Sequence, residues 1–156
     1  MVSAYNKRAV ADGFSHESMH AIQGDILDQL DTPAKKELND EEYYNFDLAV
    51  ISMALHHIDN PAELIAALSK RLANGGVLLV VDWEPSAERS FQAAGSEHED
   101  VLQTVARSGF QEDEMRTLLQ DAGLDRFEWK LFKNKSEIPR NVVNVEQLFF
   151  ARAERV

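Results

Sequence analysis

The chain has 156 residues, of which 44% are hydrophobic and 28% charged, and this ordinary composition suits one compact globular domain. Its formal net charge of −11, from 16 basic and 27 acidic residues, disfavours a nucleic-acid substrate, because phosphate binding needs clustered Lys and Arg. The lack of cysteine excludes disulfides, thiolate zinc sites and cysteine nucleophiles, and no apolar run in the sequence is long enough to span a membrane.

The first part of the chain predicts one helix and one short strand. The helix is expected over residues 1–12 and stops at Gly13. The strand is expected over Met19–Ile26 and ends in a Gly-Asp turn. Residues 27–45 are polar and acidic, which is typical of a loop, with room for one short helix over Ala34–Leu38. The N-terminus carries no secretory pattern, so we expect a cytoplasmic protein.

The middle of the chain has the clearest pattern. The nearly all-apolar run Phe46–Ser52 predicts a fully buried strand. Asn60-Pro61 then begins a helix, whose apolar face we expect to include Leu72 and whose end we expect at Asn74-Gly75-Gly76. Val77–Val81 predicts a second buried strand. A strand, a helix and a strand joined by short turns indicate a parallel sheet.

The last part of the chain predicts a cover, a helix and two strands. Residues 85–109 are polar and are interpreted as an inserted segment that covers a binding site. Phe110 is placed to staple the start of a helix that ends at Gly123. Apolar and polar residues alternate over Phe127–Leu131, which indicates a half-exposed strand. Val145–Ala153 is the last strand, and we expect these two strands to be antiparallel neighbours.

These elements carry a resemblance to a known family. The run FDLAVISMALHHIDNPAELIAALSKRLANGGVLLVVDW, with MHAIQGDI before it and GFQEDEMRTLLQDAGL after it, resembles class I S-adenosylmethionine-dependent methyltransferases of the small-molecule type. The resemblance implies an α/β, Rossmann-like fold with a mostly parallel sheet and an antiparallel C-terminal strand pair. It also implies methyl transfer from S-adenosyl-L-methionine to a small-molecule acceptor. Because it spans almost the whole chain, residues 1–156 are expected to form a single domain.

The chain departs from the family pattern at the cofactor loop. Family members begin with a strand, a glycine-rich loop that lets the backbone approach the cofactor, a helix, and a second strand that ends in a ribose-binding acid. The seven glycines of this chain form no GxGxG arrangement. We therefore interpret the chain as the C-terminal two-thirds of a methyltransferase domain with a truncated fold. By itself it is not expected to be catalytically complete.

The missing strands imply an exposed sheet edge. In the family they lie beside the strand that corresponds to Phe46–Ser52, so their loss leaves that strand with an unpaired apolar edge. A homodimer or strand-swapped assembly is the preferred cover, followed by direct pairing with Met19–Ile26 and then by a partner chain. The same edge gives the alternative function, a non-catalytic methyltransferase-like remnant that acts as an interaction or regulatory partner. A nucleotide-dependent oxidoreductase is disfavoured, because no GxGxxG is present.

The resemblance implies two groups of cofactor-binding residues. Gly24, Asp25 and Ile26 follow the first predicted strand, where the carboxylate accepts from the adenine amino group and the isoleucine packs on the adenine face. A turn role for the aspartate and a core role for the isoleucine are the alternatives. Ser52 and Met53 end the next strand, where ligands bind in open α/β sheets, and their backbone is expected to contact the methionine part of the cofactor. Structural packing of a strand end is the alternative.

His56 and His57 are the candidate catalytic residues. A neutral imidazole accepts a proton from a hydroxyl or an amine during methyl transfer. The Leu-His-His run also occurs in family members with unrelated substrates, which indicates a role in shaping the loop. On an extended segment the two rings point in different directions, so they are not a metal pair, and we expect no metal. Asp82, Trp83 and Glu84 are expected to face the substrate at the end of the second buried strand.

Overall fold

The computed structural model describes residues 1–27, 38–85, 107–137 and 145–156. The chain divides into two compact units, Met1–Glu41 and Glu42–Val156. The single domain expected over the whole chain stays a prediction. Residues 34–37 of the short helix expected over Ala34–Leu38 and most of the covering segment fall outside the described residues. Within the described ranges, no helix has the length and apolar character that a membrane span requires.

The first unit contains the predicted helix but not the predicted strand. Helix α1 (Val2–Ala11) is confirmed, and its end is closed by hydrogen bonds from the backbone N–H of Phe14 to the Ala9 carbonyl and of Gly13 to the Val10 carbonyl. The strand expected over Met19–Ile26 is wrong, because these residues form turns and irregular backbone. Asn6 explains part of this: its side chain bonds both the N–H and the carbonyl of Ala21, at 2.7 and 2.9 Å, in place of a neighbouring strand.

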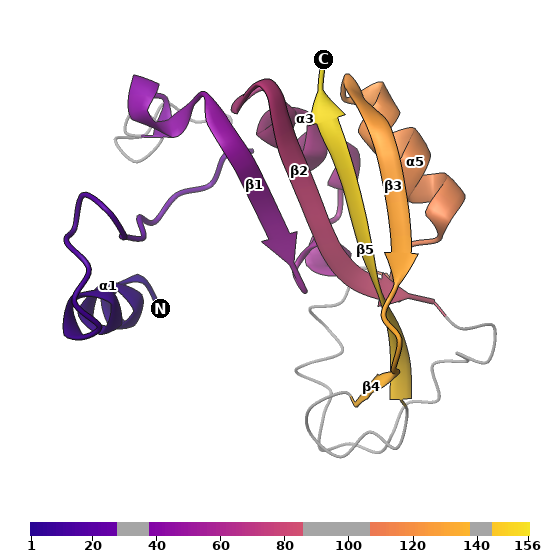
Figure 1. Cartoon of the computed structure of the whole chain (residues 1–156), viewed down its shortest axis with the longest axis horizontal. Coiled ribbons are helices and arrows are strands. Elements are labelled where there is room, and N and C mark those ends of the chain that lie inside the picture. Colours follow the sequence, from indigo (N-terminus) through magenta and orange to yellow (C-terminus); the bar gives the residue numbers. More distant parts are fainter. Residues whose placement is uncertain (28–37, 86–106, 138–144) are drawn as a thin grey trace. The chain divides into compact units, whose positions relative to one another are not determined.

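The second unit is built on a mixed sheet (Figure 1). Its strands are β1 (Phe46–Ser52), β2 (Leu72–Glu84), β3 (Leu124–Leu131), β4 (Ser136–Glu137) and β5 (Val145–Arg155). The order is β1-β2-β5-β3, and β4 pairs with the start of β5. Because β1 and β2 are parallel and β5 is antiparallel to both of its long neighbours, β1, β2 and β3 all run in one direction. This confirms the predicted fold class, including the antiparallel C-terminal pair.

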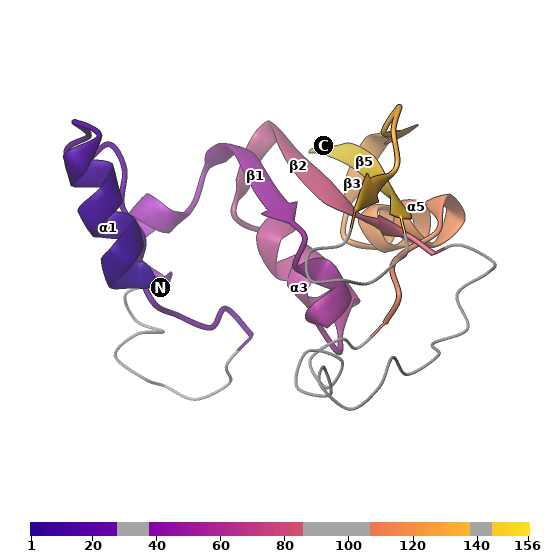
Figure 2. The same cartoon turned by 90° about the horizontal axis from the view of Figure 1, so that it is seen from below.

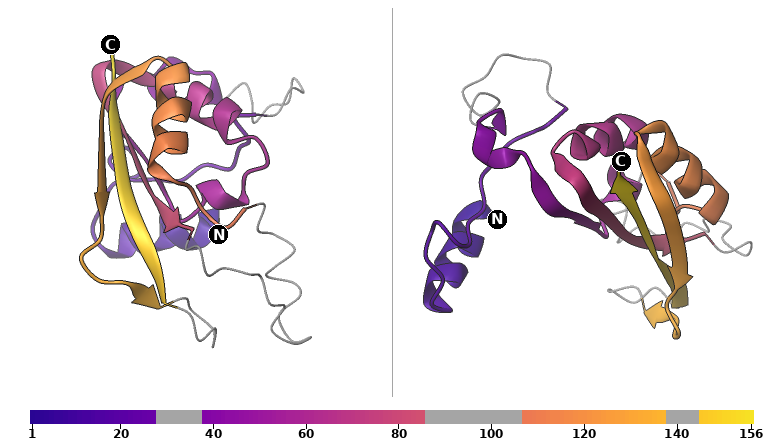
Figure 3. Two further views of the ribbon diagram at one scale, coloured as in Figure 1. Left: turned by 90° about the vertical axis from the view of Figure 1, so that its right-hand side faces the viewer. Right: turned by 45° about the horizontal axis from the view of Figure 1, so that its top comes forward.

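Two helices lie on one face of this sheet (Figures 2 and 3). Helix α3 (Pro61–Ser69) begins as predicted, with the Asn60 side chain accepting from the Glu63 N–H at 3.3 Å. Helix α5 (Glu112–Asp121) begins after the buried Phe110, also as predicted. Two short 3-10 helices, η1 (Glu41–Tyr43) and η2 (Leu55–His57), complete the described elements. The core between sheet and helices contains Leu55, Ile65, Leu72, Leu78, Val80, Phe110, Met115, Leu119, Leu124, Phe149, Ala151 and Ala153.

Strand β1 is not the fully buried strand that its sequence predicted. Ala49 and Ile51 pack against the core, but Phe46, Leu48 and Val50 are 39%, 55% and 55% exposed. Successive side chains of a strand point to opposite faces, and within Glu42–Val156 the helices α3 and α5 cover only one of these faces. The apolar composition of β1 therefore exceeds what the described core buries.

The end of α3 also differs from the prediction. The helix ends at Ser69, and Leu72 is a fully buried residue of β2 rather than of the helix. Gly75 and Gly76 lie in an irregular stretch of β2, where the register with β1 shifts. A Cβ atom on Gly76 would lie 2.6 Å from the Phe46 carbonyl oxygen. Gly76 thus permits the close approach of the two strands, whereas Gly75 has open space around it and a φ of +78°. In sequence the pair resembles a helix stop signal.

Gly109 and Gly123 provide a matched test of this packing. Both have positive φ, +134° and +77°, but only at Gly109 would a Cβ overlap the backbone of Trp83, whereas the space around Gly123 is open. We expect Gly123→Ala to cost about 1–2 kcal/mol in unfolding free energy from backbone strain alone. Gly109→Ala should cost more, because the steric overlap adds to the strain. Urea unfolding followed by circular dichroism measures both, and equal losses would contradict this account.

Candidate functional site

The candidate site lies at the carboxyl ends of β1 and β2. These strands are parallel, and Ser52 at the end of β1 pairs with Val81 near the end of β2. Both strands therefore end at the same edge of the sheet, which Figure 1 shows at the lower end of the arrows. Open α/β sheets bind ligands outside the carboxyl ends of their strands. The 3-10 helix η2 follows β1 directly and adds its residues to this edge.

The chain turns sharply as it leaves β1. Ser52 is exposed, and Met53 has a φ of +53°, in the left-handed region that non-glycine residues seldom adopt. The Met53 N–H donates to the Val81 carbonyl at 2.9 Å, which holds this conformation. Residues kept in such strained conformations cluster at functional sites. The geometry supports the predicted role of these two residues, which stays a prediction.

A buried pair of side chains lies behind this turn. Asp82 of β2 is fully buried and His56 of η2 is 7% exposed. The Nδ1 atom of His56 lies 2.6 Å from Asp82 Oδ1, and the His56 backbone N–H donates to Asp82 Oδ2 at 3.2 Å. Asp82 Oδ1 also accepts from the Trp83 N–H at 2.8 Å. The carboxylate therefore links the segment after β1 to the end of β2.

His57 lies on the outer side of this pair. It is exposed, and its ring centroid is 4.1 Å from that of His56 with the planes tilted by 39°. The prediction that the two rings point in different directions is wrong, because His56 and His57 form a 3-10 turn rather than an extended segment. In the described part of the chain, no three His, Asp or Glu side chains gather as a metal ion would require.

The chain returns to this edge after residue 106. The Arg107 N–H donates to the His56 carbonyl at 3.2 Å, and the Phe110 N–H donates to the Trp83 carbonyl at 2.9 Å. The Arg107 guanidinium lies 4.1 Å from the ring centroid of Phe110 and forms an ion pair with Glu114. Asp82 and Trp83 were expected to face the substrate, but both are buried, at 0% and 8% exposure. The segment expected to cover the site therefore rejoins the described chain beside His56.

Of the predicted site residues, the structure brings together Ser52, Met53, His56 and His57 at one edge of the sheet. Gly24, Asp25 and Ile26 belong to the other unit, Met1–Glu41. There Asp25 Oδ1 accepts the Leu27 N–H at 2.9 Å, which is the turn role that the Gly-Asp sequence allowed. The adenine contacts of this group stay a prediction.

The contact between His56 and Asp82 is the feature that sequence reasoning missed. The residues are 26 positions apart, and the pairing of β1 with β2 brings them together. One signal was present in the sequence, where Asp82 follows the apolar run Val77–Val81. Alternate residues of a strand share a face, so Asp82 lies on the same face as Leu78 and Val80, which face the core. A carboxylate buried on that face requires hydrogen-bond donors nearby.

Comparisons with known proteins place this geometry in a family. A family model described as a methyltransferase domain matches residues 5–127. No curated protein matches the chain. Among solved structures, similar folds include an O-methyltransferase family protein from Burkholderia thailandensis, with a TM-score of 0.58 and 16% identity over 98% of this chain and 40% of that one. A SAM-dependent methyltransferase from Archaeoglobus fulgidus has a TM-score of 0.58 and 12% identity, over 97% of this chain and 73% of that one.

A third similar structure is the cyclase SpnF, with a TM-score of 0.66 and 13% identity. The match covers 99% of this chain and 62% of the cyclase, so the chain spans less than two-thirds of the cyclase and less than half of the Burkholderia protein. At these identities the solved structures show the fold alone. The family model rests on the sequence, and its match runs from α1 through the β1–α3–β2 unit and α5 into β3. The chain belongs to the methyltransferase-domain family.

Proposed function

We propose that the chain takes part in methyl transfer from S-adenosyl-L-methionine to a small-molecule acceptor. The observation that carries this proposal is the strained end of β1, where Met53 is held in the left-handed region at the edge of the sheet that binds ligands in open α/β folds. Family membership supports the reaction type. The net charge of −11 supports a small acceptor over a nucleic acid.

The chain's residues fit part of the cofactor. Ser52 and Met53 would hold its methionine part, while the bound cofactor supplies an electrophilic methyl group. The adenine contacts of Gly24, Asp25 and Ile26 stay a prediction, because these residues belong to the other unit. His56 or His57 would accept the proton that the acceptor's hydroxyl or amine loses. Methyl transfer depends mainly on holding the reacting groups in line and excluding water, so no covalent intermediate with the protein is needed.

We further propose that this chain does not complete the cofactor site by itself. Its glycines form no GxGxG arrangement, so it lacks the backbone loop that would surround the rest of the cofactor. It also spans only 40% of the Burkholderia protein that shares its fold. Partial contacts imply a weaker affinity than a complete site would give.

The affinity for S-adenosylhomocysteine tests both statements. We expect calorimetric titration of the full chain to give a Kd between about 1 μM and 1 mM, which corresponds to roughly −8 to −4 kcal/mol. Backbone NMR signals of Ser52 and Met53 should shift on binding. The absence of binding at millimolar ligand would overturn the proposed cofactor, and binding much tighter than about 1 μM would overturn the incomplete site.

A bulky substitution at the same edge provides the matched variant. Ser52→Trp should abolish binding, because its side chain would fill the space beside the strained turn. Gln120→Trp is the control: it places the same side chain on an exposed position of α5, shortly before Leu124 pairs with Arg155 at the opposite end of the sheet. Equal loss of binding in the two variants would mean that the site does not lie at the end of β1.

A second candidate function is self-association through the edge of β1. The described sheet has two edge strands, β1 and β3. Strand β3 carries charged residues at Asp125, Arg126, Glu128 and Lys130, which protect an edge against pairing with another strand. Strand β1 carries only Asp47. The charges of β3 and the apolar residues of β1 therefore support association through β1 rather than through β3.

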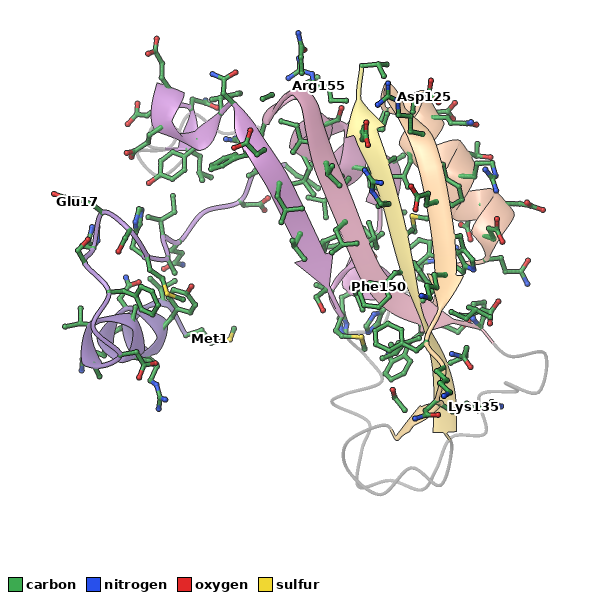
Figure 4. The ribbon with its side chains drawn as sticks, viewed as in Figure 1. Met1, Glu17, Asp125, Lys135, Phe150 and Arg155 are labelled. Atoms are coloured by element: carbon green, nitrogen blue, oxygen red, sulfur yellow. The ribbon has the colours of Figure 1, made fainter. Side chains whose placement is uncertain are left out.

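The open face of the sheet carries charged side chains over β3 and β5, with the exposed Phe150 among them (Figure 4). Over β3 and β5, Arg152 bonds Glu128 at 2.9 Å and also bonds Glu154, which Arg126 bonds at 2.8 Å. The hydrogen bond from Arg152, together with that from Arg126, lowers the pKa of Glu154, which keeps this side chain ionised. Over β1 the exposed side chains are instead Phe46, Leu48 and Val50.

The sequence of β1 suits pairing with a second copy of itself. In an antiparallel pair centred on Ala49, Leu48 lies opposite Val50, Asp47 opposite Ile51, and Phe46 opposite Ser52. No like charges meet, and apolar cross-strand pairs stabilise a sheet. We therefore propose a homodimer or strand-swapped assembly in which β1 pairs across the interface. This function would make the chain an interaction partner whether or not it transfers methyl groups.

Light scattering on the purified chain tests this assembly. We expect a dimer for the natural sequence and a monomer for the double variant Leu48→Lys and Val50→Lys, because the paired charges would face each other across the interface. Both residues are more than half exposed, so the monomer should stay folded. Leu131→Lys, at an exposed leucine of the other edge strand, should leave the dimer intact. A natural chain that stays monomeric up to high concentration would contradict the proposal.

A further inference from the structure

Asp82 carries a fully buried carboxylate within a core of aliphatic and aromatic residues. An ionised carboxylate in such a place is strongly destabilising unless donors surround it. Asp82 has three: the Nδ1–H and the backbone N–H of His56, and the backbone N–H of Trp83. The backbone N–H of His56 joins η2 to the end of β2, and that of Trp83 comes from β2 itself. The third bond, to the imidazole ring, is also the shortest at 2.6 Å.

This third bond determines which nitrogen of His56 carries the proton. A carboxylate only accepts hydrogen bonds, so the proton between the two groups belongs to Nδ1 of the ring. In the neutral imidazole the other nitrogen, Nε2, is then unprotonated and able to accept a proton. Without a partner at Nδ1, a neutral histidine ring favours the opposite, Nε2–H tautomer.

His56 lies close to the candidate site, where an unprotonated Nε2 could accept a proton. The residue follows the strained end of β1 by three positions, and its side chain keeps 9% of its surface exposed, whereas Asp82 has none. The carbonyl of His56 accepts the Arg107 N–H, where the chain rejoins the described structure after the predicted cover. In this pair the carboxylate of Asp82 is fully buried, and the imidazole of His56 lies at the edge of the candidate site.

We propose that Asp82 is a positioning residue that holds His56 in the Nδ1–H tautomer, so that Nε2 accepts the proton of the methyl acceptor. This inference rests on the proposed function. In that step the acceptor's O–H or N–H bond breaks and an Nε2–H bond forms, while the acceptor atom bonds to the methyl carbon and the sulfur keeps the electron pair of the broken C–S bond. His56 becomes an imidazolium, which the buried carboxylate of Asp82 stabilises.

The tautomer can be measured without any ligand. In the full chain labelled with 15N-histidine, at a mildly alkaline pH where imidazoles are neutral, long-range proton–nitrogen NMR spectra distinguish the two forms. We expect His56 to be protonated at Nδ1. A natural chain with His56 protonated at Nε2 would overturn the proposal, and this result requires no variant to fold.

Asp82→Leu then tests the cause, because leucine has the same branched arrangement of side-chain heavy atoms and no hydrogen-bond acceptor. We expect His56 to change to the Nε2–H form in this variant. Ser69→Ala is the control, since it removes another buried hydrogen bond, from Ser69 Oγ to the Ala122 carbonyl at 2.8 Å, away from the site. It should leave the His56 tautomer unchanged. An Nδ1–H tautomer that persists in Asp82→Leu would show that Asp82 does not set it.

Access to Nε2 is a separate requirement with its own readout. Diethyl pyrocarbonate modifies unprotonated imidazole nitrogens, and mass spectrometry locates the product. We expect His56 to react in the natural chain and several-fold more slowly in Asp82→Leu, with the exposed His16 and the half-buried His20 as internal references in both. No reaction at His56 in the natural chain would overturn its role as proton acceptor. Failure of S-adenosylhomocysteine to bind would instead overturn the proposed function and leave the tautomer result standing.

Discussion

The second unit depends on the two different pairings of β2. Its outer side pairs in parallel with β1 and its inner side pairs antiparallel with β5, and its core-facing residues Leu78 and Val80 are fully buried under the helices. Parallel pairing requires the crossover through α3, which brings the ends of β1 and β2 to one edge. Antiparallel pairing with β5 fixes the other side of the strand. The candidate site is a consequence of the first pairing, and the second joins β2 to the rest of the sheet.

Asp82 connects the packing of β2 to the proposed chemistry of the site. It occupies the next core-facing position after Val80, where an apolar residue would be the ordinary choice. Burial makes the carboxylate depend on donors, and the segment that can supply them is the one that leaves β1 at the same edge. Two of the three donors come from His56, so the group that stabilises the end of β2 also orients the ring beside the site.

Local signals in the sequence predicted the elements that short-range physics decides. Asn60 and Pro61 start α3, Gly123 follows α5, and the alternation of Phe127 and Trp129 with charged residues marks β3. Each of these depends on caps, dihedral angles or side-chain period within a few residues. The fold class followed from the order of these elements and from the family resemblance.

The sequence failed where distant parts of the chain decide the outcome. Gly75 and Gly76 look like a helix stop, but Gly76 lies where β1 approaches closely, which local sequence does not show. Phe46, Leu48 and Val50 predicted burial on both faces, yet burial is a property of the elements that cover a strand and not of the strand alone. In the same way, local sequence identified the site residues Ser52, Met53, His56 and His57. The contact of His56 with Asp82 depends on the pairing of β1 with β2, which local sequence does not show.

The two proposals for β1 meet at Ser52. In the proposed antiparallel pair, Ser52 of one copy lies opposite Phe46 of the second copy. The interface would then place an aromatic side chain next to the turn at which Met53 is held and where the methionine part of the cofactor is proposed to bind. Methyl transfer needs a site from which water is excluded, because bound water competes for position with the acceptor. A chain that supplies only part of the cofactor site thus gains most from association at this edge, so assembly and catalysis would depend on the same strand.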